Sequence, residues 1–144
     1  MVLPVGSAIV DRATAHATAP WLALLGTWFV FWSGGVRLVL AGLRQLIQPR
    51  FTAKEIFGIA SDDPLPLVQE LGVANLASGI AAAASIVFPS FVLPMAVVGA
   101  IFYGAAGIRH LGDAHRNAKQ NLAMATDLLV GVVLVVYVIG AALG

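Results

Sequence analysis

Four long apolar stretches, separated by short polar segments, dominate the pattern of the chain. They cover about residues 21–43, 67–88, 91–111 and 121–143. A helix of about 20 residues crosses the roughly 30 Å hydrocarbon core of a bilayer, because each residue adds about 1.5 Å. The pattern therefore predicts an all-α, polytopic membrane protein whose domain, residues 20–144, is a bundle of four transmembrane helices.

Residues 1–19 follow a different pattern. Their short apolar run is interrupted by Pro4 and Gly6 and is followed by Asp11, Arg12 and His16. No basic residue precedes the run, so a cleaved signal peptide is not favoured. A mixed apolar and charged segment of this kind is typical of a helix lying on the membrane surface or of a disordered segment, and both alternatives stay open.

Basic residues gather at one end of the predicted helices. Because successive spans alternate in direction, six of the eight Lys and Arg residues fall on one face: Arg44, Arg50, Lys54, Arg109, Arg116 and Lys119. The opposite face holds Arg12. Positively charged loops stay in the cytoplasm, so we expect the loop of residues 51–66 to be cytoplasmic and both termini to be extracytoplasmic.

Composition narrows the classes of function. Hydrophobic residues make up 60% of the 144 positions, charged residues make up 10%, and mean hydropathy is +0.93. The lipid bilayer is therefore the expected partner, while a homo-oligomer or a larger membrane complex stays open. Cysteine is absent, which excludes disulfides and thiolate metal sites, and a net charge of +1 without a basic tract gives no indication of nucleic-acid binding.

Charged residues inside the apolar stretches are the strongest candidates for a site. Arg37 lies in the first stretch, Glu70 near the start of the second and Asp127 in the last. A guanidinium stays charged at this depth, so Arg37 must reach toward the interface or face an anion inside the bundle. We expect it to pair with Asp127 or Glu70, either as a static ion pair or as part of a substrate or proton pathway.

Further polar side chains lie on the same helices. Asn75 is expected to hydrogen-bond a neighbouring helix. His110 and Asp113 are three residues apart, a spacing at which two side chains can share a cation, and with Glu70 they form a candidate metal site. Asn117 and Asn121 precede Asp127 along one side of the last span.

Several of these residues also carry a resemblance to a known family. Residues 69–79 (QELGVANLASG), residues 101–110 (IFYGAAGIRH) and the positions Asn117, Asn121 and Asp127 resemble an uncharacterised prokaryotic family of four-helix membrane proteins, a domain of unknown function. Loosely, the architecture is also similar to DoxX-like proteins. The resemblance implies a prokaryotic inner-membrane protein whose site comprises Glu70, Asn75, His110, Asn117, Asn121 and Asp127.

Three functions remain in competition. The first, which the sequence favours over the other two, is a structural or accessory membrane protein whose polar cluster fixes helix packing. The second is a small-solute or proton-linked carrier that uses Arg37, Glu70 and Asp127, and the third is a metal- or cofactor-dependent membrane enzyme. No catalytic motif is present, so no catalytic residue is predicted and the cofactor stays unknown. The most informative observation would be whether a cavity from the cytoplasmic face reaches Asp127.

Overall fold

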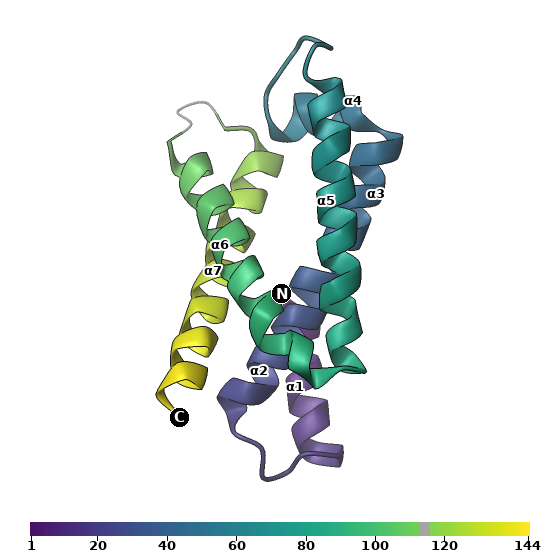
Figure 1. The fold of residues 1–144 in the computed structure, drawn as a ribbon. Coiled ribbons are helices and arrows are strands. Elements are labelled where there is room, and N and C mark those ends of the chain that lie inside the picture. Colours follow the sequence, from purple (N-terminus) through teal and green to yellow (C-terminus); the bar gives the residue numbers. More distant parts are fainter. Residues whose placement is uncertain (113–115) are drawn as a thin grey trace.

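The computed structural model describes residues 1–112 and 116–144, and this part of the chain contains helices and no strand (Figure 1). Four helical stretches are long and apolar enough to cross a membrane: Trp21–Ile47, Leu65–Ile86, Pro89–Leu111 and Ala118–Leu143. Large apolar side chains on their outer surfaces, such as Leu40, Ile80, Ile101 and Leu122, are more than half exposed. The predicted all-α, polytopic membrane class is confirmed.

The first span is built from three consecutive helical segments. They are α2 (Trp21–Phe29), the π-helical segment η1 (Val30–Val36) and α3 (Arg37–Ile47). The helix continues past residue 43, where the apolar stretch ends, and stops at Gln48. It stops there because the following residue, Pro49, disfavours a helical conformation in the residue before it.

The other three spans begin at helix-start signals. They comprise α5 (Leu65–Ala83) with the 3-10 turn η3 (Ala84–Ile86), the 3-10 turn η4 (Pro89–Phe91) with α6 (Val92–Leu111), and α7 (Ala118–Leu143). Helix α7 starts three residues before the predicted span because Asn117 and Gln120 form a capping box. Their side chains satisfy backbone N–H groups that the first turn leaves without partners.

The spans pack most extensively as two pairs, α3 with α5 and α6 with α7 (Figure 1). Glycines bring the backbones of each pair together. A methyl group on Gly42 would lie 2.6 Å from the carbonyl oxygen of Gly72, and one on Gly131 would lie 3.0 Å from the amide nitrogen of Gly104. Small residues at such contacts are how helices associate closely in lipid.

A short helical turn connects the two pairs at the end opposite to the C-terminus (Figure 1). It consists of α4 (Pro49–Phe51) and η2 (Thr52–Ile56), within a segment that the sequence predicts as a loop. Two bonds attach it to α7: Lys119 Nζ lies 2.6 Å from Glu55 Oε2, and the Gln120 side chain donates to the Ile56 carbonyl at 3.1 Å. The connection therefore holds α7 beside the first span.

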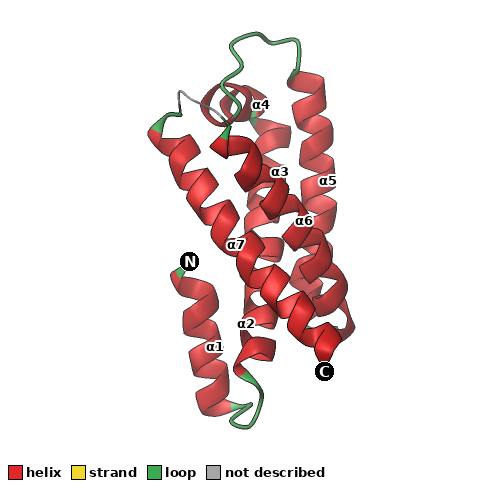
Figure 2. Cartoon of the chain, turned by 90° about the vertical axis from the view of Figure 1, so that its left-hand side faces the viewer, coloured by secondary structure: helices red, strands yellow, loops and turns green. Residues whose placement is uncertain are grey.

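Residues 2–14 form the helix α1 (Val2–Thr14), which runs alongside α2 (Figure 2). The indole nitrogen of Trp28 donates to Asp11 at 2.9 Å, and that of Trp32 donates to Ser7 at 2.9 Å. A hydrogen bond with His16 at 2.6 Å, helped by the Trp28 bond, holds the pKa of Asp11 below its ordinary value although burial acts against it. The location of α1 on the membrane surface stays a prediction.

Candidate functional site

A cavity of about 380 Å³ lies between the two helix pairs. Leu38 of α3, Leu71 of α5 and Phe102 of α6 contribute apolar walls, and Phe57, which follows η2, also lines the cavity. The polar side chains that line it are Arg37, Arg44, Gln45, Thr52, Asn75, Tyr103, His110 and Asp127. Mostly apolar walls with a few converging polar groups are typical of a small-molecule site.

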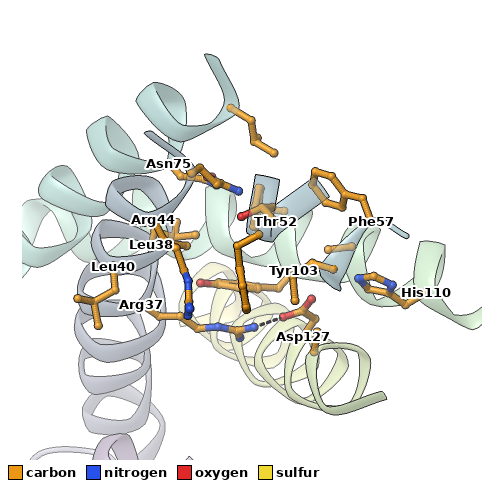
Figure 3. Close-up of a pocket in the computed structure, with 18 residues that line it drawn as sticks. Arg37, Leu38, Leu40, Arg44, Thr52, Phe57, Asn75, Tyr103, His110 and Asp127 are labelled. Atoms are coloured by element: carbon orange, nitrogen blue, oxygen red, sulfur yellow. Dashed lines mark hydrogen bonds and ion pairs between the residues drawn. The ribbon is translucent and has the colours of Figure 1, made fainter. Parts of the chain in front are cut away.

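An ion pair crosses this cavity from the first span to the last. Arg37 Nη2 donates to Asp127 Oδ1 at 2.6 Å, as the dashed line in Figure 3 marks. The Asp127 side chain is only 8% exposed, against 35% for Arg37. Because a buried charge without a partner is costly, each group stabilises the other in its position. The predicted pairing of Arg37 with Asp127 is confirmed.

Arg37 also contacts Tyr103, which comes from α6. The guanidinium carbon lies 5.0 Å from the centroid of the Tyr103 ring, and the Tyr103 hydroxyl donates to the carbonyl oxygen of Ser33 in η1. The ring face is attractive to a cation. Arg37 is therefore oriented by two spans at once, α7 through the carboxylate and α6 through the ring.

Two guanidinium groups share the space with a single carboxylate. Arg37 Nη1 is buried and has no hydrogen-bond partner within the described part of the chain. Arg44 projects into the same space (Figure 3), and its guanidinium carbon lies 3.7 Å from the centroid of the Phe51 ring. Arg44 makes no ion pair with any described residue. Counting these three groups, the cavity carries one excess positive charge.

An amide pair lies beside the two arginines and joins α3 to α5. The Asn75 side chain donates to Gln45 Oε1 at 2.8 Å, and both residues are buried. Asn75 thus bonds a neighbouring helix, as expected. Gln45 was not predicted as a site residue, although its spacing from Leu38 and Gly42 places all three on one face of α3. That spacing is the signal that could have identified it.

Among the predicted site residues, Arg37, Asn75, His110 and Asp127 meet at the cavity. Glu70 is exposed on α5 and is not part of the lining, so the structure does not show it as a partner of Arg37. The two other asparagines act locally at the start of α7. Asn117 caps the helix and donates to the Glu55 carbonyl at 3.1 Å, while Asn121 accepts from Arg116 at 3.0 Å.

The candidate metal site is not assembled among the residues that the structure describes. Asp113 lies outside them, and Glu70 is exposed while His110 is buried. Within residues 1–112 and 116–144, no three His, Cys, Asp or Glu side chains gather into a group that could hold a metal ion. Metal binding by Glu70, His110 and Asp113 therefore stays a prediction.

The helices and the ion pair define a small multi-pass membrane protein with a mostly apolar cavity between its spans. Residues 1–143 match a family described as a family of unknown function (DUF6790), and the chain belongs to this family. No curated protein and no solved structure matches the chain. The match extends the resemblance over nearly the whole sequence, whereas the similarity to DoxX-like proteins stays a prediction.

Proposed function

We propose that the protein is a membrane carrier for a small solute, and that the cavity containing Arg37 and Asp127 receives this solute. The observation that carries the proposal is a cavity of about 380 Å³ that reaches the buried ion pair. Small-molecule sites in proteins occupy roughly 300–1,000 Å³ and combine apolar walls with a few polar groups. A polar cluster that only locked helix packing would need no such space.

A structural or accessory role is the second candidate. It is supported by the two polar contacts that join spans, Arg37 with Asp127 and Gln45 with Asn75. Such contacts fix the register of helices in lipid whether or not a solute binds. The two functions differ in one observable property, which is whether molecules from the aqueous phase enter the cavity.

We further propose that the protein lies in the inner membrane of a prokaryote, with both termini outside and the α4–η2 connection in the cytoplasm. The cluster of basic residues at that end supports this orientation. In this orientation the cavity lies toward the cytoplasmic half of the membrane, because Phe51, Thr52 and Ile56 contribute to its lining.

Access to the cavity can be tested with single cysteines, because the chain has none of its own. Ala106 lines the cavity, whereas its neighbour Ala105 is exposed on the outer surface of α6. We expect N-ethylmaleimide to modify Ala106→Cys faster than Ala105→Cys in lipid nanodiscs, measured by mass spectrometry. The thiolate is the reactive form, and a thiol surrounded by hydrocarbon stays protonated.

The two substitutions form a matched pair at the same membrane depth. Ala41→Cys, on the opposite wall of the cavity, provides a second lining position if Ala106→Cys folds poorly. Equal, slow modification of both lining cysteines and of Ala105→Cys would show a cavity closed to water. That result would reject the carrier and leave the structural role.

A further inference from the structure

We infer that the solute is an amphipathic monoanion, a compound with one carboxylate or similar anionic group on a compact apolar body. This inference rests on the proposed function and specifies the substrate class of the same cavity. It follows from three properties of the lining: its charge balance, the positions of its free donors and the chemistry of its walls.

Charge balance favours one negative charge, because Arg44, although exposed, lines the cavity together with Arg37. Asp127 neutralises Arg37 at 2.6 Å, and Arg44 then remains as a second guanidinium in the cavity without a carboxylate among the described residues. An arginine does not lose its proton under any physiological condition. A monoanion would bring the group of charges to neutrality, whereas a cation would raise the excess charge and a dianion would reverse its sign.

The free donors lie where an anionic group could contact both arginines. Arg37 uses Nη2 for Asp127, while Nη1 is buried and has no partner in the described ranges. Figure 3 shows Arg37 and Arg44 projecting from the same face of α3. Charge-assisted hydrogen bonds from guanidinium groups to a carboxylate are among the strongest available to a protein. An anion held by both would satisfy the Arg37 donor that the protein leaves free.

The remaining walls suit an apolar body of limited size. Leu38, Leu71, Phe57 and Phe102 surround the polar end. Taking about 30 Å³ for each water-sized group, 380 Å³ has room for roughly a dozen non-hydrogen atoms. A small aromatic or branched carboxylate fits this space.

A matched series of probes tests the charge requirement. 4-Phenylbutyrate, 4-phenylbutanol and 4-phenylbutylamine share one apolar body and differ in charge. We expect 4-phenylbutyrate to slow the modification of Ala106→Cys by N-ethylmaleimide, and the alcohol and the amine to protect at least about tenfold less effectively. The protein is held in phosphatidylcholine nanodiscs, which contain no anionic lipid.

A second substitution assigns the effect to Arg44. In the Ala106→Cys protein, Arg44→Gln should raise the half-protecting concentration of 4-phenylbutyrate at least about tenfold, equivalent to about 1.4 kcal/mol. Arg50→Gln is the control, because Arg50 is an exposed arginine that pairs with Asp62 and does not line the cavity. It should leave protection unchanged.

The outcomes separate the two proposals. The monoanion proposal is overturned if the alcohol or the amine protects as strongly as 4-phenylbutyrate, or if no probe protects at all. Neither result contradicts the carrier proposal. Slower modification of Ala106→Cys when phosphatidylglycerol is added without any probe identifies a lipid headgroup as the occupant and also overturns the monoanion proposal. If Ala106→Cys reacts no faster than Ala105→Cys, the carrier itself fails, and the substrate class fails with it.

Discussion

Breaking the ion pair from either side should destabilise the protein far more than replacing both partners. In Arg37→Leu, the Asp127 carboxyl loses its partner in a position where its side chain is only 8% exposed. The carboxyl can then take up a proton, which at pH 7 costs about 4 kcal/mol for an aspartate of ordinary pKa, at about 1.4 kcal/mol for each of roughly three pH units. This cost is the upper limit of the electrostatic loss.

Asp127→Leu leaves the opposite charge behind. Arg37 cannot lose its proton, but its side chain is 35% exposed and borders the cavity. We expect a loss of about 2.5–3.5 kcal/mol, the range that insertion scales give for an arginine at the centre of a membrane helix. The double substitution removes both charges and should lose about 1 kcal/mol or less relative to wild type, because apolar pairs replace buried ion pairs at little cost.

The measurement is a double-mutant cycle on unfolding free energies in mixed micelles, followed by the fluorescence of the three tryptophans. The expected coupling between the two positions is at least about 2 kcal/mol. Neutral hydrogen bonds between membrane helices couple by about 0.6 kcal/mol on average. A coupling of that size or smaller, with the losses of the single variants adding up in the double variant, would refute a buried ion pair at this position.

Three further predictions concern packing, the N-terminal helix and orientation. In a detergent melt, Gly42→Ala should lower the stability of the protein by about 1–3 kcal/mol, because the added methyl group meets backbone atoms of α5. Gly104→Ala should be neutral or raise the stability by up to about 1 kcal/mol, because its methyl group meets nothing within 4 Å. Equal effects of the two substitutions would contradict close packing at Gly42. The pKa of Asp11 in the folded state is lowered below 3.8, so its hydrogen bonds stabilise the protein above that pH and this stabilisation is lost as the pH falls through the folded-state pKa. The difference in melting temperature between wild type and Asp11→Asn should therefore shrink below about pH 4, and a difference independent of pH would contradict this. An impermeant thiol reagent added outside should label Thr18→Cys, in the exposed turn between α1 and α2, and not Ser61→Cys. The reverse result would invert the proposed orientation.

Sequence alone was sufficient for the membrane class and for the expectation that Arg37 reaches the interface or faces an anion inside the bundle. Apolar length fixes the spans, and the high cost of a charge in hydrocarbon leaves Arg37 few ways to be accommodated. The choice between Asp127 and Glu70 as its partner could not be made, because it depends on which spans lie across the cavity from α3. That arrangement is set by tertiary packing, which the pattern of a single helix does not encode.

Two of the differences between prediction and structure have identifiable causes, one local and one long-range. Asn117 was assigned to the site, but with Gln120 it forms a capping box, a pattern readable from the sequence itself. The sequence did not predict the helical turn at residues 49–56, because its charged residues resemble those of a polar loop. Its position depends on bonds to α7, which come from more than sixty residues away in the chain.

The cavity follows from how the spans divide into pairs. Glycines such as Gly42 and Gly131 let α3 approach α5 and α6 approach α7 closely, and the cavity lies between the two pairs. The polar contacts that bridge this volume, from Arg37 to Asp127 and from Tyr103 to Ser33, all originate or end on the first span. The same guanidinium that holds the first and last spans together therefore presents its second nitrogen to any molecule between them. A solute that bound this nitrogen would also contact the ion pair that joins the first and last spans. The same contact would then couple solute binding to the packing of these two helices.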